Sequence, residues 1–282
     1  MSDAAMATAP AGGAHEAQAG ADLHHHDEEH TEGIYTIAPL VVSLGLAVAA
    51  TSLVLRSPLI FLGMGIFSYG AWLWLREYLP TRADEHPVVS THAPFAGIEV
   101  RKVGIWLFLM TEMMVFSSLV STYVRYRLEA GADWVPAASH QDLFLGSLNT
   151  FILLSSSFTL AMALDAARHG KQQRMMYGLV ITLMCGVAFL LIKAVEWYEM
   201  IYLEPEPFTP WGSVEGTTFY VTTGTHGGHV LGGVIVLGYL IYKGANRGWG
   251  PTNSNSIEYF GLYWHFVDII WALPVFPFFY LI

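Results

Sequence analysis

Two histidines stand in an otherwise apolar stretch of the chain, GTHGGHVLGG at residues 224–233. His226 and His229 are three residues apart, so on a helix both imidazoles project from roughly one face. Two imidazoles so placed can bind a metal ion or a haem, or they can form hydrogen bonds across a helix contact. The spacing of the histidines alone leaves these interpretations open.

The same stretch has a glycine at every fourth position, namely Gly224, Gly228 and Gly232. Small residues at this spacing let two helices approach closely in lipid. A haem needs room beside its ligand, whereas the glycines indicate a neighbouring helix at that place. We therefore interpret the stretch as a tightly packed helix whose histidines are structural.

Three further apolar segments carry ionisable residues. In GIWLFLMTEMMVFSS, Glu112 lies eight residues after Gly104, about 12 Å along a helix at about 1.5 Å per residue. That position is close to the middle of a membrane span. With no basic residue within a turn, burial favours the protonated form of Glu112. Both a proton-handling role and a structural carboxyl fit this pattern.

In LLIKAVEWYEM, Lys193 lies three residues before Glu196 and four before Trp197. The spacing predicts an ion pair with a cation–π neighbour on one helix face. The position near a helix end also predicts that the charged groups extend toward the membrane surface. A structural role accounts for all three residues.

In IEYFGLYWHFVDIIWALP, His265 and Asp268 lie on one helical stripe with Gly261 and Ala272. We expect His265 and Asp268 to be hydrogen-bonded, with the carboxylate fixing the imidazole tautomer. The same arrangement is found behind metal-bound histidines. Spacing does not separate the two interpretations.

The composition identifies the elements that must position these residues. Of 282 residues, 54% are hydrophobic and only 13% are charged, about half the charged share of a soluble domain. A helix needs about 20 apolar residues to cross a membrane. Seven segments qualify: 35–55, 58–77, 103–125, 143–164, 176–201, 217–242 and 257–281. Cys185 has no partner cysteine, and no basic face suited to nucleic acid is present.

The short loops predict the orientation of the spans, because lysine and arginine favour the cytoplasmic side. With the N-terminus inside, nine basic residues lie in inner loops and three in outer loops. The nine are Arg76, Arg82, Arg101, Lys102, Arg168, Lys171, Arg174, Lys243 and Arg247, and the three are Arg56, Arg125 and Arg127. The C-terminus and the acidic loop 202–216 then face outward.

The chain is expected to divide into a tail and a membrane domain. Residues 1–33, which include HHHDEEH at 24–30, are rich in alanine, glycine, histidine and acids. Such a segment is expected to be disordered. We place it in the cytoplasm and assign residues 34–282 to the seven-helix domain.

Three classes of function fit these features. A membrane metalloenzyme would use His226, His229, His265 and Glu112 as ligands, but the expected depths of these histidines in the membrane disagree. An ion transporter would use the intramembrane charges as a path, but no internal repeat is visible. A non-catalytic subunit would use its polar stripes to bind partner helices and lipids.

Six stretches of the chain, in order, favour the third class. They are WLREY at 74–78, RKVGIWLFLMTEMMVF at 101–116, LNTFILLSSS at 148–157, EWYEM at 196–200, TTGTHGGHVLGG at 222–233 and YWHFVDIIW at 263–271. From about residue 58 to 271 the chain resembles subunit III of the haem–copper terminal oxidases, the cytochrome c oxidase subunit III family.

The resemblance implies an all-α integral membrane fold with seven transmembrane helices. Two N-terminal helices would be splayed from a five-helix bundle, leaving a V-shaped cleft filled with phospholipid. It also implies no metal in this chain, because haem and copper belong to partner subunits. Partners would be subunit I, as the main contact, subunit II and small subunits, in a bacterial or archaeal plasma membrane.

The resemblance also implies roles for particular residues. Glu112 matches a buried glutamate that faces subunit I near the proton-uptake route, and Trp74, Arg76 and Glu77 match residues that contact a lipid head group. The implied function is an accessory one in aerobic electron transport: stabilising subunit I and supporting proton uptake. Lys193, the tail and the ending ALPVFPFFYLI depart from the family pattern. Related subunits accompany quinol oxidases and nitric oxide reductases, so the electron donor stays open.

Overall fold

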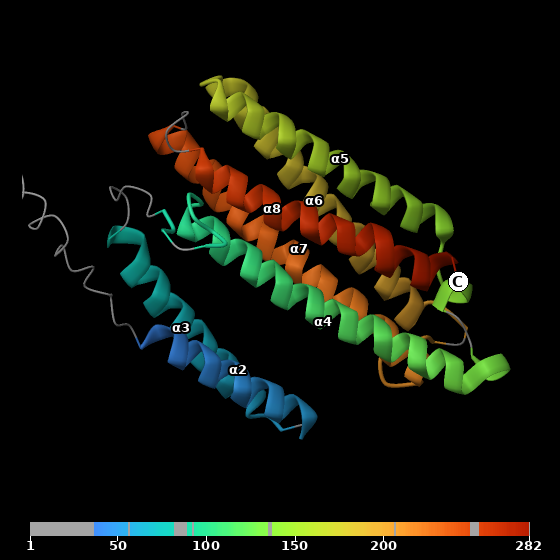
Figure 1. Ribbon diagram of the computed structural model, residues 1–282. Coiled ribbons are helices and arrows are strands. Elements are labelled where there is room, and N and C mark those ends of the chain that lie inside the picture. The colour runs from blue at the N-terminus through green and yellow to red at the C-terminus, as the bar shows by residue number, and fades with distance from the viewer. Residues whose placement is uncertain are drawn as a thin grey trace, which may run out of the picture. The chain divides into compact units, whose positions relative to one another are not determined.

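The computed structural model describes residues 37–55, 57–81, 89–91, 93–134, 137–205, 207–248 and 254–281. The predicted disordered tail, residues 1–33, lies outside these ranges. The chain divides into two compact units, Met1–His86 and Pro87–Ile282. Both units are helical (Figure 1), and the described residues contain no strand beyond an isolated bridge between Val89 and Glu99.

The first unit is a hairpin of two apolar helices, α2 (Ala38–Val54) and α3 (Ile60–Thr81). Glycine allows their close approach. A Cβ added at Gly45 would collide with the backbone of Phe67, and one added at Gly63 would collide with the backbone of Ala49. Small residues at crossing points are typical of helix pairs in membranes.

The second unit contains five long helices that lie side by side (Figure 1). Their bounds are α4 (Val100–Ala130), α5 (Leu143–Arg168), α6 (Gln172–Tyr202), α7 (Val214–Arg247) and α8 (Asn255–Ile270). The short turns η1 (Gly131–Asp133) and η2 (Ala137–His140) lie between α4 and α5. The last helix continues through η3 (Trp271–Val275) and η4 (Pro277–Leu281).

The winding changes to π-helical where α8 passes into η3 and η4. Pro274 and Pro277 lie in these segments. Proline has no N–H group and disrupts regular α-helical hydrogen bonding, so a changed winding is expected there. The unusual ending of the sequence therefore forms the last part of the seventh helix.

Each of the seven predicted segments is a helix in the structure. The five of the second unit are long and apolar enough to cross a membrane, counting Asn255–Leu281 as one, and α2 and α3 contain shorter apolar helices. The chain is therefore an all-helical, multi-pass membrane protein. Helix ends extend beyond the predicted bounds in several cases, for example to Arg168 in α5.

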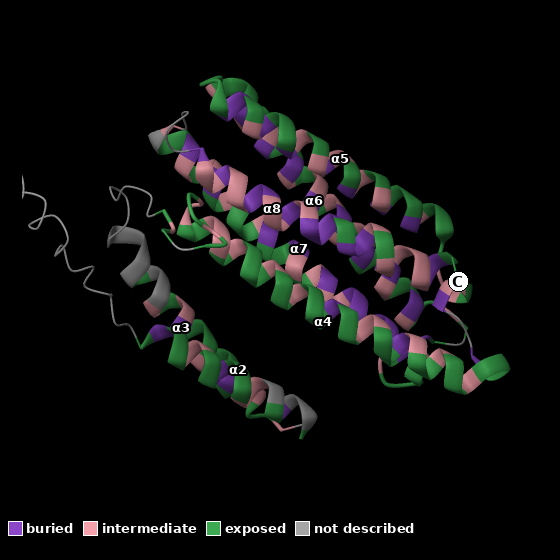
Figure 2. Cartoon of the chain, in the orientation of Figure 1, coloured by how far each residue is buried: buried purple, intermediate pink, exposed green. Residues whose placement is uncertain are grey.

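The core of the second unit lies among α5, α6, α7 and α8, where buried residues form stripes along the helices (Figure 2). Trp264 and Trp271 are its largest buried side chains. By contrast, only Phe116 and Tyr123 are buried on α4. Most of α4 is thus left to contact lipid or other protein.

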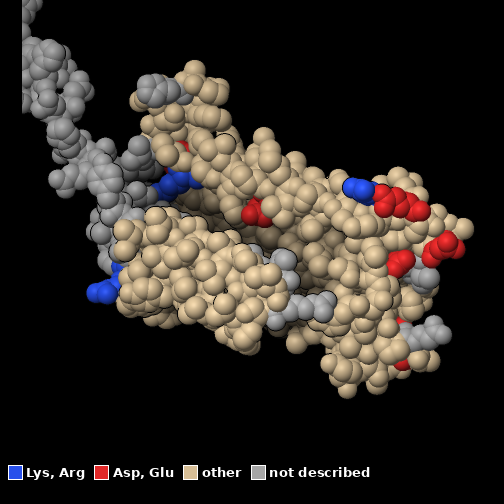
Figure 3. Space-filling view, turned by 90° about the horizontal axis from the view of Figure 1, so that it is seen from below, with Lys and Arg blue, Asp and Glu red and all other residues tan. Residues whose placement is uncertain are grey.

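On the face shown in Figure 3, charged side chains lie mostly toward the helix ends, and most of the surface between them is uncharged. At one end, Glu258 of α8 binds Lys102 of α4 at 2.5 Å and Arg168 of α5 at 2.7 Å. At the other, His140 and Glu204 pair at 2.7 Å between two loops. These contacts join the helices of the second unit outside the apolar region.

Candidate functional site

Glu112 and His229 meet between α4 and α7. The Oε2 atom of Glu112 lies 2.9 Å from Nε2 of His229, and the two side chains are 18% and 20% exposed. The residues are 117 positions apart in the chain. The partner of Glu112 cannot be read from the spacing within its own helix, because it comes from a distant part of the chain.

The second nitrogen of His229 determines how protons are placed in this pair. Its Nδ1 lies 2.7 Å from the carbonyl oxygen of Thr225. A carbonyl can only accept, so Nδ1 donates and carries a hydrogen. The contact between Nε2 and Glu112 then holds one proton, bonded either to the carboxyl or to the imidazole. The pair has no net charge in either arrangement, which suits it to a lipid environment.

His226 does not join this pair. It is fully buried, and its ring centroid lies 5.0 Å from that of Trp271 and 5.6 Å from that of Phe189. Neither ring nitrogen has a hydrogen-bond partner among the described residues. The imidazoles of His226 and His229 therefore have different surroundings despite their shared helix face.

The proposed metal ligands His226, His229, His265 and Glu112 do not converge. Within the part of the chain that the structure describes, no group of three or more His, Cys, Asp or Glu side chains could hold a metal ion. The metalloenzyme hypothesis therefore has no ligand set among these residues.

Lys193 and Glu196 form the ion pair that their spacing predicts, at 2.9 Å. The pair is buried, so the expected extension of Lys193 toward the membrane surface is wrong. Tyr280 of η4 completes the site: its hydroxyl is 2.6 Å from Lys193 Nζ and donates to Glu196 Oε1 at 2.7 Å. The C-terminal segment thus supplies a third side chain to this buried ion pair, which the spacing of Lys193 and Glu196 did not predict.

The cation–π contacts of Lys193 also differ from expectation. Its Nζ lies 5.1–5.4 Å from the ring centroids of Phe219, Trp271 and Tyr280. Trp197, the predicted neighbour, packs instead against Tyr220 at 5.1 Å. Rings from other helices reach the ammonium group because it points into the core.

The sequence predicts a direct hydrogen bond between His265 and Asp268, whereas the structure places a third side chain between them. Ser157 of α5 lies between them. Its Oγ is 2.8 Å from His265 Nδ1 and donates a hydrogen bond to Asp268 Oδ2. Ser157 belongs to a run of three serines in an apolar span, LLSSS. That run is the sequence signal that could have identified it.

These polar sites lie in a chain whose family is identified by comparison with known proteins. A model of the family "Cytochrome c oxidase subunit III" matches residues 32–282. The chain belongs to the cytochrome c oxidase subunit III family. Members of this family are subunits of haem–copper oxidases, which are oxidoreductase complexes.

Relatives of this subunit III chain carry several oxidase names. A "Heme-copper oxidase subunit I+III" of Aeropyrum pernix is 31% identical over 258 residues, which make up 88% of this chain and 31% of that protein. A "Probable cytochrome c oxidase subunit 3" of Nocardia farcinica is 33% identical over 169 residues, 60% of this chain and 82% of that protein. The chain thus spans about a third of the fused relative.

A third relative, "Probable quinol oxidase subunit 3" of Staphylococcus aureus, is 32% identical over 176 residues. These residues make up 62% of this chain and 85% of that protein. Cytochrome c and quinol oxidases are therefore both represented at similar identity. Identity alone does not distinguish the donor.

Within the described chain, the glycine stripe of this subunit III does not form the close helix contact that its spacing predicts. A Cβ at Gly224 would lie 3.2 Å from Trp197, but one at Gly228 would meet nothing within 4 Å in the described chain, and one at Gly232 would meet only the Tyr263 hydroxyl at 3.9 Å.

The close approach lies one residue further along α7. A Cβ at Gly233 would lie 2.5 Å from the Trp264 ring, and one at Gly186 of α6 would lie 2.9 Å from it. Gly186 and Gly233 therefore make room for the indole of Trp264. Glycine spacing does not show which face of a helix meets a large side chain of the same chain, and close packing of the exposed Gly228 against another subunit stays a prediction.

The predicted lipid-binding residues lie at the end of α3. Arg76 is exposed, and its guanidinium carbon lies 5.4 Å from the centroid of the Trp72 ring. The side chains of Trp74 and Glu77 lie outside what the structure describes. The lipid site stays a prediction.

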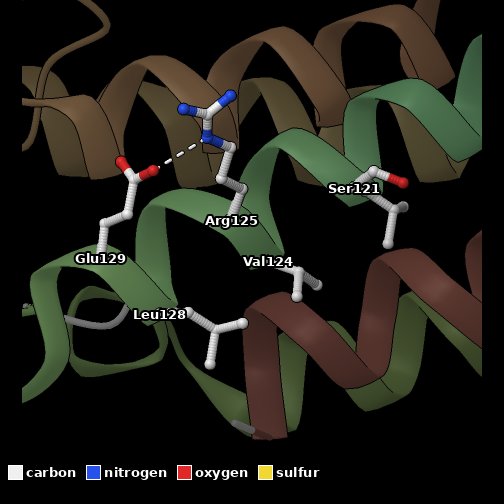
Figure 4. A pocket seen from close by; sticks show the side chains of 6 residues that line it. Ser121, Val124, Arg125, Leu128 and Glu129 are labelled. Atoms are coloured by element: carbon white, nitrogen blue, oxygen red, sulfur yellow. Dashed lines mark hydrogen bonds and ion pairs between the residues drawn. The ribbon is translucent and has the colours of Figure 1, made fainter.

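A surface hollow lies near the end of α4 (Figure 4). Arg125 and Glu129 point toward one another there, at 2.9 Å, while Val124 and Leu128 point away from that pair. All its lining residues belong to α4, and both charged side chains are more than half exposed. An exposed ion pair of this kind contributes little to stability.

Proposed function

We propose that this chain is an accessory, non-catalytic subunit of a proton-pumping cytochrome c oxidase of the aerobic respiratory chain. It stabilises subunit I and supports proton uptake. Two observations support the partner: membership of the subunit III family, and the relative in Aeropyrum whose name joins subunits I and III in one protein. Subunit II and small subunits complete the proposed complex.

The pair of Glu112 and His229 carries the proposal. A lone charge at mid-membrane costs about 2.5–3.5 kcal/mol on insertion scales. The pair avoids this cost because it holds one proton and no net charge, yet both side chains are partly exposed. Uptake of a proton at one of the two groups and release of one from the other restores the uncharged pair, so the pair can pass protons without retaining a net charge.

Haem and copper in the partner subunits supply the electron transfer and O2 reduction. The residues of this chain hold and position a proton, bind lipid and pack against subunit I. Trp74, Arg76 and Glu77 form the proposed lipid head-group site, since a guanidinium suits a phosphate. We also propose that α2 and α3 are splayed from the five-helix unit and leave a V-shaped cleft filled with lipid.

The proposed orientation has the N-terminus in the cytoplasm and the C-terminus outside, in a bacterial or archaeal plasma membrane. The ion-paired end with Lys102, Arg168 and Glu258 would then face the cytoplasm. This agrees with the preference of basic residues for that side.

Metal and haem analysis of the purified chain, beside the subunits that co-purify with it, tests the accessory role. We expect haem and copper only with the co-purified subunits, because the described residues offer no ligand cluster. Stoichiometric haem or copper in the isolated chain would exclude the accessory role.

A quinol oxidase is the second candidate, supported by the Staphylococcus relative. The purified complex distinguishes the two by its reductant. Rapid oxidation of reduced cytochrome c supports the first candidate, whereas oxidation of quinol alone supports the second. No relative described above is named as a nitric oxide reductase subunit.

A further inference from the structure

Ser157 joins two ionisable side chains of another helix inside the membrane. Its Oγ is 2.8 Å from Nδ1 of His265 and donates a hydrogen bond to Oδ2 of Asp268. His265 and Asp268 lie on α8, and Ser157 lies on α5, which packs against it. The imidazole and the carboxyl are thus connected through a single hydroxyl.

Among the described residues, no cationic side chain is in direct contact with Asp268. Its residue is 2% exposed, and its Oδ1 has no hydrogen-bond partner among the described residues. No lysine, arginine or histidine nitrogen forms an ion pair with it there, and Lys193 is bound to Glu196. A buried carboxyl in such surroundings favours a bound proton.

A hydroxyl can transmit a proton because it donates one hydrogen and accepts others. In one arrangement, His265 Nδ1–H donates to Ser157, and the Ser157 hydroxyl donates to the Asp268 carboxylate. In the other, the Asp268 carboxyl O–H donates to Ser157, and the Ser157 hydroxyl donates to an unprotonated Nδ1.

The two arrangements differ by one proton transfer that needs no other reactant. The N–H bond of the imidazolium breaks as an O–H bond forms on Ser157, and the former O–H bond of Ser157 breaks as one forms on Asp268. Imidazolium and carboxylate become imidazole and carboxylic acid, and Ser157 is unchanged. We propose that His265, Ser157 and Asp268 form a proton-binding site, in which Asp268 stores the proton and His265 exchanges it through Ser157.

The geometry differs from that of a hydrolytic triad. There the carboxylate holds the second imidazole nitrogen and leaves the serine free to attack. Here the carboxyl binds the serine hydroxyl itself, so Ser157 is a bridge. The site is also separate from Glu112 and His229, which lie on α4 and α7, and it does not rest on the proposed oxidase function.

The two ends of the site, His265 and Asp268, differ in exposure, and this difference determines which end exchanges protons with the surroundings. His265 is partly exposed, whereas Asp268 is buried. In a membrane span this exposed surface meets lipid or a partner subunit, so the imidazole is the end of the site that a proton donor outside the chain can reach. Removing the hydroxyl should isolate the carboxyl without removing its proton-binding group.

Infrared difference spectra of the full chain with its co-purifying subunits, in lipid nanodiscs, test the proton on Asp268. We expect a carbonyl-stretch band of a protonated carboxylic acid that shifts with isotope-labelled aspartate and is lost in Asp268→Asn. If the Asn variant does not assemble, a change in the frequency of the labelled band in Ser157→Ala assigns it to Asp268, because Ser157 is hydrogen-bonded to that carboxyl. The absence of any aspartic acid band over the accessible pH range would overturn the proposal.

The exchange of that band with deuterium tests the bridge. In Ser157→Ala we expect the band to persist and its exchange to slow about tenfold or more, because the connecting hydroxyl is lost. Ser155→Ala, two residues earlier on α5, should exchange like the unchanged protein. Equal exchange rates in the Ser157 and Ser155 variants would show that the proton reaches Asp268 by another route and would overturn the relay.

Discussion

At the scale of single residues, two ionisable side chains of this membrane domain have their hydrogen-bond partners on other helices. Glu112 is bound to His229 across α4 and α7, and Asp268 is bound to Ser157 across α8 and α5. Each contact gives the ionisable group a hydrogen-bond partner, which the lipid tails cannot provide. The buried polar groups thus determine how helices are matched as well as where protons can reside.

Replacing Lys193 by Met should destabilise the chain strongly. The change leaves Glu196 buried without its cation, which costs about 3–5 kcal/mol for a broken buried pair. Thermal unfolding in detergent should show a large loss, whereas Lys171→Met, at an exposed position, should change stability by about 0.5 kcal/mol or less. Equal effects of the two substitutions would contradict a stabilising role for the buried pair.

At the scale of helices, the sequence predicts the elements better than their contacts. Runs of about 20 apolar residues mark the spans because lipid requires a closed backbone hydrogen-bond pattern of that length. All seven predicted segments are therefore helices. The partners of Glu112 and Asp268 were missed because they depend on the rotation and shift of one helix against another, which follow from packing of the whole unit.

The glycines of α7 show the same limit. Their spacing predicts close packing at Gly228, whereas the structure places the large neighbour, Trp264, against Gly233. The buried residues of α7 form one stripe that includes Val230, Gly233 and Leu237, and the exposed Gly228 lies off that stripe. Glycine spacing alone does not show which face of the helix is buried within the chain.

Two leucine substitutions separate these interpretations. Gly233→Leu should prevent correct packing of the chain, because even a Cβ there would lie 2.5 Å from the Trp264 ring. Gly228→Leu should be tolerated by the isolated chain, since nothing lies within 4 Å of a Cβ at that site. Monodisperse elution and unfolding temperature of the purified variants provide the measurement. Greater damage from Gly228→Leu would contradict the observed packing.

At the scale of the whole molecule, a five-helix unit and a two-helix hairpin carry different proposed tasks. The five-helix unit contains the groups proposed to bind protons and the aromatic core, while the hairpin carries the exposed Arg76. The exposed apolar face of α4 and the paired Glu112 support contact with a partner in the membrane. An accessory subunit with both a protein-facing and a lipid-facing part fits this division.

Arg76→Gln should reduce the anionic phospholipid that co-purifies with the complex, because it removes the cation proposed to bind a phosphate. Native mass spectrometry can count the bound lipids. Arg174→Gln, an exposed change in the other unit, provides the control. Unchanged lipid content in the Arg76 variant would exclude this residue from the head-group site.

Proton uptake by the purified oxidase complex, compared between the unchanged protein and Glu112→Gln, tests the central claim most directly. Glutamine keeps the size of the side chain and a hydrogen bond to His229 but removes the titratable carboxyl. We expect normal assembly and haem content, with slower proton uptake or faster inactivation during turnover. Proton uptake and turnover lifetime equal to those of the unchanged complex, or a failure of Glu112→Gln to assemble, would contradict a proton-handling role for this subunit.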